Sequence, residues 1–278
     1  MINLYNKTSY NCSKIVATNY STSFSIGIRM LKKEFRDPVY AIYGYVRIAD
    51  EIVDTFHDYD KKALLEDYKK ATYEALETKI SSNPVINSFQ EVVHKYNIDI
   101  ELIEAFLNSM KMDLYNRVYD EKTYKNYLYG SAEVVGLMCL KVFCEGNEVL
   151  YQNLKGPARA LGSGFQKVNF LRDMRSDFND RGRVYFPGVD FNKFTIDEKK
   201  VIENDILKNF EITRNGIKAL PKGSKFGVYV AFMYFYSLLK KIRKSSEADI
   251  TKERVRVGNV SKIFILCDSF LRFKFKML

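Results

Sequence analysis

The sequence predicts an all-α protein with one domain, and two observations carry that prediction. The first is a scarcity of interruptions, because the 278 residues include only five prolines and no long segment rich in glycine, proline or serine. The second is the spacing of apolar residues, which recur three and four positions apart as they do on one face of a helix. Since 46% of the residues are hydrophobic, the chain can bury a large core. No repeat or change of composition marks a boundary, so residues 1–278 are assigned to a single domain.

The turn signals divide the chain into long helical segments. Pro38 and Pro84 mark helix starts, Gly182 marks a stop before the Pro187 loop, and the triplet Lys155-Gly156-Pro157 signals a break. To within a few residues, the expected helices cover 20–33, 37–56, 60–80, 84–95, 99–115, 121–145, 147–180, 196–219 and 223–246.

The amino-acid composition makes several classes of protein improbable. The four cysteines form no CxxC pair and are accompanied by only two histidines, so neither a zinc site nor a disulfide framework is expected, and a reducing cytoplasm fits best. We find no signal region and no run of 18 uncharged apolar residues, so neither export nor a membrane span is expected. The net charge of +10 suits nucleic acid, an anionic membrane surface or a polyanionic small substrate equally well.

The segment YGYVRIADEIVD, residues 43–54, places two carboxylates on one helix face. Asp50 and Asp54 are four residues apart, and Arg47 precedes Asp50 by three, so all three side chains project from one side of a helix. A lone pair at this spacing is usually a solvent-facing stripe. Here the pair is interleaved with apolar residues, which leaves little room for a wholly exposed face and favours a ligand site.

The segment FQKVNFLRDMRSDFNDRGRVYFP, residues 165–187, sets polar groups into an otherwise apolar helix. At about 100° per residue around the helix axis, these groups all point within about 80° of the direction of Asn169. They are Gln166, Asn169, Arg172, Asp173 and Asp177. Because an unpaired polar group is costly to bury, we interpret this side as a surface built to bind something.

Together the two clusters suggest metal-assisted binding of diphosphates. Carboxylate and amide oxygens are the ligands that Mg²⁺ prefers, and Mg²⁺ commonly bridges carboxylates to substrate phosphates. Arginine supplies a planar donor that suits phosphate. Each cluster alone is a weak signal, whereas two acidic helices that each carry an arginine predict a site where magnesium, or manganese in its place, holds diphosphate groups.

These segments resemble the squalene and phytoene synthase family, which condenses two prenyl diphosphates head to head. The likeness runs through STSF (21–24), YGYVRIADEIVD (43–54), MKMDL (110–114), YLYGSAEVVGL (127–137) and QKVNFLRDMRSDFNDRGRVYFP (166–187). The last is the most discriminating. The resemblance implies an all-α isoprenoid synthase fold with a central cavity between two aspartate-rich helices.

The resemblance also assigns roles to individual residues. It implies that the metal ligands are Asp50, Asp54, Asn169, Asp173 and Asp177. The four aspartates, with Tyr129, are the implied catalytic residues, and Asp113 is expected to support the cavity. Glu133 stands where many members have glycine, close to Tyr129. The residues implied in diphosphate binding are Ser21, Ser23, Arg47, Gln166, Arg172, Arg183 and Arg254.

The expected reaction joins two geranylgeranyl diphosphates through a cyclopropyl diphosphate intermediate to phytoene, the first committed step of carotenoid biosynthesis. The chain looks closest to bacterial phytoene synthases, because of YGSAEVVGLMCLKVF and the lack of a C-terminal anchor. A squalene or dehydrosqualene synthase that uses two farnesyl diphosphates is the alternative, and NADPH is expected only if squalene is the product.

Two further alternatives come from other classes of protein. A non-catalytic relative that serves as an assembly factor would be expected to lose metal ligands, yet both acidic motifs are complete. A basic nucleic-acid binder rests on charge alone, so no nucleic acid is expected as a partner. We expect a cytoplasmic enzyme that contacts the inner face of the membrane peripherally, its basic faces meeting anionic lipids.

Overall fold

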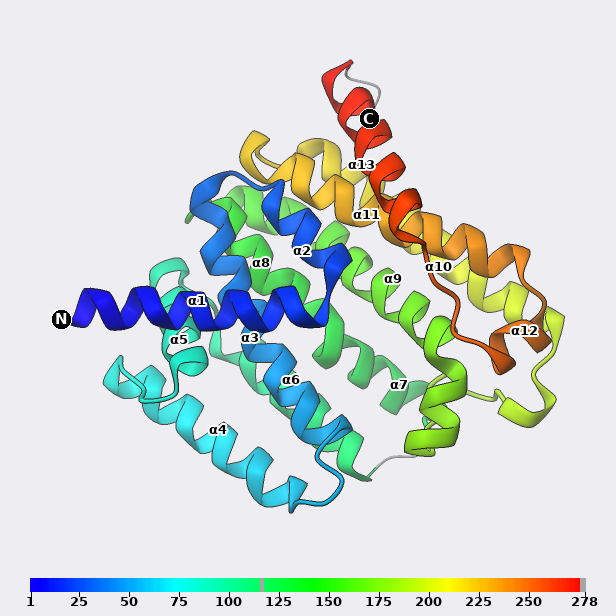
Figure 1. Cartoon of the computed structure of the whole chain (residues 1–278), viewed down its shortest axis with the longest axis horizontal. Helices are drawn as coiled ribbons and strands as arrows, with labels where there is room; N and C mark the ends of the chain where they lie inside the picture. Colours follow the sequence, from blue (N-terminus) through cyan, green and yellow to red (C-terminus); the bar gives the residue numbers. More distant parts are fainter. Residues whose placement is uncertain (116–117, 276–278) are drawn as a thin grey trace.

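The computed structural model describes residues 1–115 and 118–275, and within these ranges every regular element is a helix (Figure 1). A single isolated parallel bridge joins Val118 to Val184. The all-α prediction is therefore confirmed. The helices are α1 (Ile2–Tyr20), α2 (Thr22–Arg29), α3 (Lys33–Asp54), α4 (Lys61–Thr78), α5 (Pro84–Tyr96), α6 (Ile100–Tyr115), α7 (Glu121–Leu128), the π-helical turn η1 (Tyr129–Glu133), α8 (Val134–Cys144), α9 (Glu148–Arg181), the 3-10 turn η2 (Phe191–Lys193), α10 (Ile196–Ala219), α11 (Lys222–Lys244), α12 (Glu247–Lys252) and α13 (Asn259–Lys274).

Several helix ends follow the expected chemistry. Asn83 accepts hydrogen bonds from the amides of Val85 and Ile86, with Pro84 in the first turn of α5. Gly182 ends α9 with a φ of 66°, a left-handed conformation that glycine adopts without steric cost. These local signals were sufficient because they depend only on neighbouring residues.

Two prolines lie inside helices, which corrects the expected breaks. Pro38 sits in α3, which begins at Lys33, and Pro157 sits in α9, which runs without interruption from Glu148 to Arg181. A proline removes one backbone donor and strains a helix interior. Packing compensates for this at Pro157, since its ring fits against Gly216 of α10, where an added Cβ would lie 2.2 Å from the Cβ of Pro157.

We expect Gly216→Ala to lower the free energy of unfolding by about 1–3 kcal/mol, because the methyl group would overpack this contact. Thermal or denaturant unfolding followed by circular dichroism measures the change. Gly156→Ala is the matched control. It lies one position before Pro157 with no atom within 4 Å of its added Cβ, so it should be neutral or stabilising by up to about 1 kcal/mol. Equal effects of the two substitutions would contradict the contact.

The N-terminal helix α1 was not expected because its buried side is made of small polar residues. Ser9, Ser13 and Ala17 are buried at four-residue spacing, which gives no apolar periodicity. These small side chains let α1 approach α3 so closely that a Cβ on Gly44 would lie 2.9 Å from the Cβ of Ser13. Ser13 also shares a 2.8 Å hydrogen bond with Ser88 of α5. Tertiary packing therefore stabilises α1.

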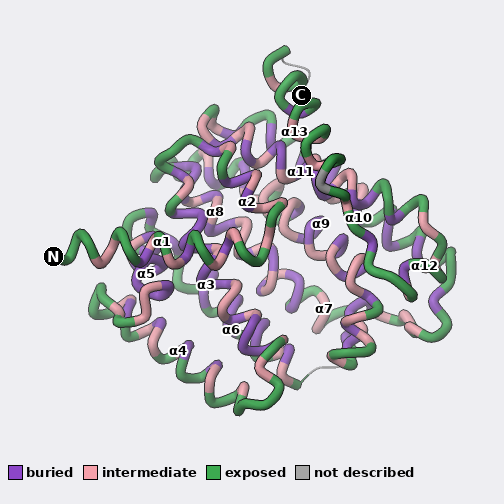
Figure 2. The backbone as a smooth tube through the Cα atoms, in the orientation of Figure 1, coloured by how far each residue is buried: buried purple, intermediate pink, exposed green. Residues whose placement is uncertain are grey.

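The interior of the protein lies along α3, α6, α8 and α9, and α4 and α13 are largely exposed (Figure 2). In the described part of the chain one segment, Glu121–Cys144, is long and apolar enough to cross a membrane. Its most apolar window is 56% buried, and η1 packs against both α6 and α9. These contacts are those of a core helix.

Candidate active site

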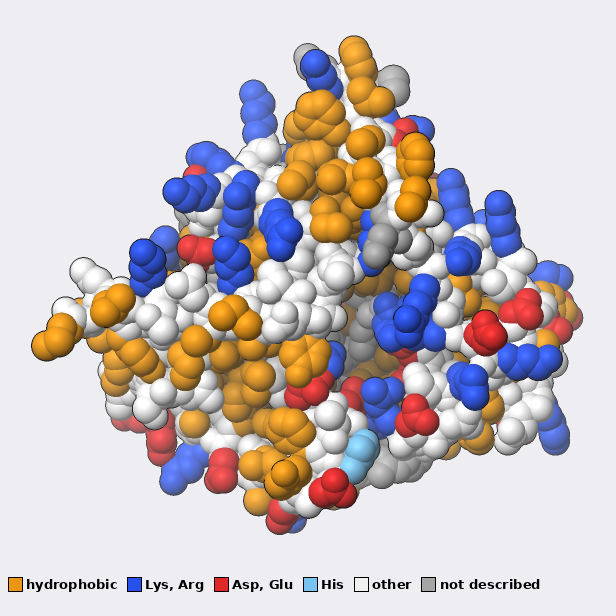
Figure 3. Space-filling view, in the orientation of Figure 1, with side chains coloured by type: hydrophobic (Ala, Val, Ile, Leu, Met, Phe, Trp, Pro, Cys, Tyr) orange, Lys and Arg blue, Asp and Glu red, His pale blue; other side chains and the backbone are white. Residues whose placement is uncertain are grey.

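A cavity of about 810 Å³ opens among α2, α3, α8, α9 and α11. Figure 3 shows a hollow edged by Lys and Arg and by Asp and Glu side chains. Much of the lining is apolar, with Phe106, Leu140, Phe143, Leu154 and Leu161 among its side chains. The charged and amide side chains that line the cavity are Arg47, Asp50, Gln166, Asn169, Arg172, Arg254, Arg256 and Lys262.

An aromatic cluster lines part of the cavity wall. Phe165 and Phe235 stack with ring centroids 3.8 Å apart. Phe24 lies 5.3 Å from Phe235 and 5.7 Å from Tyr43. All four rings line the cavity. Their faces carry negative partial charge, which attracts a cation.

The two acids of α3 lie in different surroundings. Asp50 lines the cavity, and its nearest cation is the guanidinium of Arg47 at 4.0 Å. Arg47 is itself engaged by Glu51 and stacks over the Tyr20 ring, with its carbon Cζ 4.4 Å from the ring centroid. Burial in this recess, together with the charge of Asp54, raises the pKa of Asp50 to about 7. The cations near Asp50 therefore do not neutralise its carboxylate.

The polar side of α9 includes one unsatisfied oxygen and two aspartates. Asn169 Oδ1 is buried with no hydrogen-bond partner among the described residues. Burial alone would raise the pKa of Asp173, but Arg172 at 2.9 Å and Arg254 at 2.7 Å outweigh it and lower that pKa. Burial, followed by the charge of Asp173, raises the pKa of Asp177 to about 7. Within the described ranges Asn169 thus lacks a hydrogen-bond donor, and Asp177 has one guanidinium in contact, that of Arg181, where Asp173 has two.

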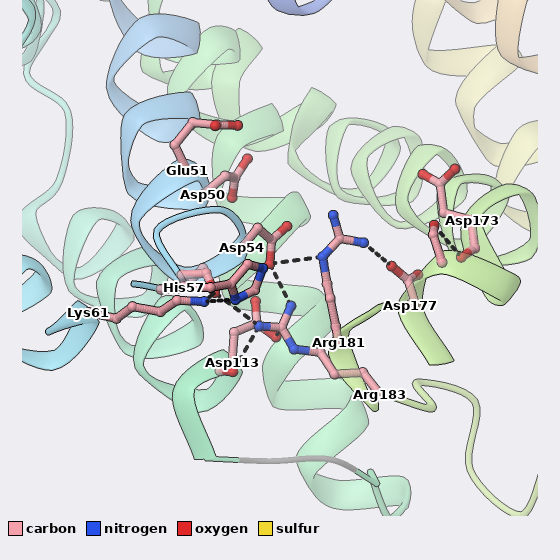
Figure 4. Close-up of polar contacts among 12 residues, drawn as sticks. Asp50, Glu51, Asp54, His57, Lys61, Asp113, Asp173, Asp177, Arg181 and Arg183 are labelled. Carbon is pink, nitrogen blue, oxygen red and sulfur yellow. Dashed lines mark hydrogen bonds and ion pairs between the residues drawn. The ribbon is translucent and has the colours of Figure 1, made fainter. Parts of the chain in front are cut away.

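Arg181 bridges the two acidic helices, as Figure 4 shows. Its Nη1 lies 2.8 Å from Oδ1 of Asp177, and its Nε lies 3.5 Å from Oδ1 of Asp54. Arg183 Nη1 contacts the same Asp54 oxygen at 2.6 Å. The first and second acidic motifs therefore face each other, and a guanidinium lies between Asp54 and Asp177. Sequence reasoning did not single out Arg181, and its only signal was a position four residues after Asp177.

A network of buried polar groups around Asp113 holds Arg183 in place. Arg183 Nη2 donates to the carbonyl of Asp113 at 2.9 Å, and the Asp113 carboxylate accepts hydrogen bonds from Tyr127 at 2.7 Å and Tyr119 at 3.2 Å. Burial raises the pKa of Asp113 to about 6, although Arg183 lowers it. Arg183 is 4% exposed and does not line the cavity. This placement favours a role in which Arg183 holds Asp54 in position, and not the predicted role of binding a diphosphate.

The predicted metal ligands suit a divalent ion by chemistry but are not gathered around one point. In residues 1–115 and 118–275, no group of three or more His, Cys, Asp or Glu side chains is close enough to hold a metal ion as it stands. The donors are nevertheless hard oxygens. The unsatisfied Asn169 oxygen and the charge-deficient Asp50 and Asp177 are the groups that a cation would complete. Closing the site requires Arg181 to release Asp177.

Most of the residues predicted to bind diphosphate line the cavity: Ser21, Ser23, Arg47, Gln166, Arg172 and Arg254. Ser21 also caps α2, accepting a 3.2 Å hydrogen bond from the amide of Phe24. Tyr43, Arg256 and Lys262 line the cavity too and were not predicted. The alternation of basic residues at 252, 254 and 256 was a signal for Arg256.

Tyr129 was predicted to be catalytic, and it is not among the residues that line the cavity. It opens the π-helical turn η1, and Arg159 lies over its ring at 5.3 Å. Arg159 is held by Glu133 at 2.6 Å, and Ser163 donates to the same carboxylate. Glu133 therefore anchors Arg159 above Tyr129. This geometry favours a structural part for Tyr129 over a contact with the reacting carbons.

Comparison with known proteins agrees with this arrangement. A family model described as squalene/phytoene synthase matches residues 17–214. The chain belongs to the squalene/phytoene synthase family. This family member is 26% identical over 283 residues to a phytoene synthase from Arthrospira platensis, covering 93% of this chain and 91% of that one. It is 22% identical over 273 residues to a 4,4'-diapophytoene synthase from Staphylococcus haemolyticus, covering 91% and 93%.

The family membership also accounts for the fold. A crystal structure of a dehydrosqualene synthase with bound ligand superposes with a TM-score of 0.83 at 20% identity, covering 97% of this chain and 98% of that one. The fold is thus the all-α isoprenoid synthase fold. As a member of the family, the protein is a prenyltransferase of the head-to-head condensing type and a component of isoprenoid biosynthesis.

Proposed function

We propose that the protein condenses two molecules of geranylgeranyl diphosphate to phytoene, the first committed step of carotenoid biosynthesis. The observation that carries the proposal is one cavity of about 810 Å³ that combines an arginine-rich polar lining with an aromatic and aliphatic wall. A prenyl diphosphate has the same two parts. The likeness to the phytoene synthase of Arthrospira platensis supports the choice of product.

The arginines at the polar lining would bind the diphosphate groups. Arg47, Arg172 and Arg254 all line the cavity, and guanidinium groups donate two parallel hydrogen bonds to phosphate oxygens. Arg172 and Arg254 both contact Asp173 in the ligand-free protein. A diphosphate would therefore compete with Asp173 for these two donors and leave that carboxylate available to a cation.

The ions that fit the remaining donors are Mg²⁺ and, as an alternative, Mn²⁺. Asp50, Asp54, Asn169, Asp173 and Asp177 would hold them. Bound there, the ions would supply positive charge to the departing diphosphate.

The proposed reaction has two ionisations. In the first, the carbon–oxygen bond of one substrate breaks, diphosphate leaves, and the double bond of the second substrate attacks the allylic cation. Loss of a proton closes a cyclopropyl diphosphate. In the second, that intermediate loses its diphosphate, the ring opens, and loss of another proton forms the central double bond of phytoene. Oxygens of the departed diphosphate accept the protons, since Tyr129 lies outside the cavity lining.

The cavity wall would protect the cations from water. The ring centroids of Phe24, Phe165 and Phe235 lie 3.8–5.7 Å from one another, and that of Phe24 lies 5.7 Å from that of Tyr43. Ring faces stabilise positive charge, and an apolar wall excludes the water that would quench it.

A second candidate function uses two farnesyl diphosphates and yields dehydrosqualene, or squalene where NADPH supplies hydride. The likeness to the 4,4'-diapophytoene synthase of Staphylococcus haemolyticus favours it. The two candidates share every residue of the polar lining and differ only in the length of tail that the apolar wall accommodates.

The mass of the hydrocarbon product separates the candidates. Purified protein is incubated with Mg²⁺ and either geranylgeranyl or farnesyl diphosphate, with and without NADPH, and the extract is analysed by mass spectrometry. We expect a forty-carbon hydrocarbon from geranylgeranyl diphosphate that is unchanged by NADPH. Product from farnesyl diphosphate alone would refute the phytoene assignment, and product from neither would refute both.

A further inference from the structure

The last helix, α13, turns an apolar face to solvent. Six of its large apolar residues or those at its end are at least 51% exposed, and Phe264 is 72% exposed. They are Val260, Ile263, Phe264, Phe270, Leu271 and Phe275. Figure 3 shows hydrophobic side chains gathered over α13. We call this set the α13 patch.

The spacing of the α13 patch is that of one helix face. Pairs of its members are three, four or seven residues apart, such as Val260 and Ile263, Val260 and Phe264, and Phe264 and Leu271. A helix normally turns residues with this spacing toward its core. The other side of α13 is the one that packs on α11: Ser269 is fully buried, and the ring of Phe273 lies 5.0 Å from that of Phe226. The backbone carbonyl of Lys262 accepts a 2.9 Å hydrogen bond from Tyr234. The apolar stripe is therefore a second face that the fold leaves unpartnered.

Basic residues outnumber acidic residues on α13 itself. Lys262, Arg272 and Lys274 outnumber the single acid of the helix, Asp268, which pairs with Arg272 at 2.7 Å. Figure 3 shows further Lys and Arg side chains on both flanks of the patch.

The neighbouring elements that supply basic groups are α2 and α11. The contact between Phe226 and Phe273 places the start of α11 beside the end of α13. A 2.8 Å backbone hydrogen bond from Lys32 to Gly223 brings the turn between α2 and α3 to the same place. Lys32 and Lys222 there are exposed.

The α13 patch also adjoins the cavity. Lys262, on the first turns of α13, lines the cavity together with Val257 and Gly258, and its side chain bonds to Thr22 of α2. The helix that carries the patch therefore forms part of the cavity rim. The family match ends at residue 214, so α13 lies outside the segment that the family model covers.

We propose that the α13 patch docks the protein on an anionic lipid bilayer, with α13 lying in the plane of the interface. An apolar helix face bordered by Lys and Arg binds such surfaces, because its side chains enter the acyl boundary and its charges meet anionic headgroups. A symmetric dimer through the same patch is disfavoured, since the basic flanks of the two copies would face each other. Docking places the cavity rim at the bilayer, where a hydrocarbon product would leave without crossing water. This last step rests on the proposed function, whereas docking itself does not.

Vesicle binding by the full chain tests the proposal without any turnover. Co-sedimentation is measured with vesicles of phosphatidylcholine alone and with vesicles that also contain phosphatidylglycerol. We expect binding to the anionic vesicles that weakens as salt is raised. We expect Ile263→Ser/Phe264→Ser to lower the partition coefficient by at least about tenfold.

The matched control is Leu4→Ser, an equally exposed apolar position at 70%, which lies on α1 at the far end of the molecule from α13 (Figure 1). It should bind vesicles as the wild type does, and circular dichroism should show that all the variants are folded. Wild-type binding by the double variant would overturn the proposal. So would a wild-type dimer in sedimentation velocity that the double variant dissociates while its vesicle binding is unchanged.

Discussion

Asp50→Ala is expected to lower kcat by about 10²–10³-fold or more, the loss typical of removing one group that stabilises charge in a transition state. Asp50 lines the cavity, and among residues 1–115 and 118–275 its nearest cation is Arg47 at 4.0 Å. Its oxygens are thus the ones most free to bind an ion that neutralises the departing diphosphate. Product formation from prenyl diphosphate at saturating Mg²⁺ measures the effect.

The same substitution should leave the fold intact. Burial raises the pKa of Asp50, so its ionised form is disfavoured in the folded state and lowers stability at pH values above the ordinary carboxyl pKa. At pH 8 the alanine variant should therefore unfold at the wild-type temperature or above it. Asp67→Ala, at an exposed position of α4, is the control and should keep wild-type activity. Activity of Asp50→Ala above a tenth of the wild-type value would contradict the assignment.

Arg183→Met is expected to lower the free energy of unfolding by about 3–5 kcal/mol, the loss typical of removing one partner of a buried ion pair. Arg183 is 4% exposed, and it contacts Asp54 at 2.6 Å and the Asp113 carboxylate at 3.6 Å. Methionine would fill much of the space but leave these acids without that charge. Denaturant unfolding of the ligand-free protein measures the change.

A double variant tests whether charge is the cause. Arg183→Met/Asp113→Asn removes one of the stranded carboxylates, so it should be less destabilised than the sum of the two single variants. Arg214→Met, at an exposed position of α10, should change the free energy of unfolding by less than about 0.5 kcal/mol. A loss below about 1 kcal/mol in Arg183→Met would show that the buried pair does not hold the site.

The sequence was sufficient to place the acidic motifs but not to describe their contacts. Helical periodicity fixes which side of a helix Asp50 and Asp54 share, and the resemblance supplied the second motif as its counterpart. The bridge through Arg181 depends on how α3 and α9 approach each other, which no local pattern encodes. The burial of Arg183 depends in the same way on Asp113, seventy residues away in the chain.

The same distinction applies to the helices. α5 and α9 carry their own signals in Asn83, Pro84 and Gly182, so their ends were predictable. α1 carries buried serines, so it gave no apolar pattern. α13 does carry an apolar stripe, but the prediction of helices ended before it, and the sequence alone does not tell that this stripe faces outward. The catalytic role of Tyr129 stays a prediction from the motif, because a motif fixes the identity of a residue and not the cavity that its side chain reaches.

The arginine contacts have a consequence for how the newly made chain matures. Asp54, Asp173 and Asp177 each already have a guanidinium beside them, so the polypeptide supplies its own counter-charges. Unlike a small zinc domain, whose folding depends on its metal, this chain should reach its native state in a cell short of divalent ions. Such a cell would contain folded but inactive enzyme, which would become active when the ions are supplied again.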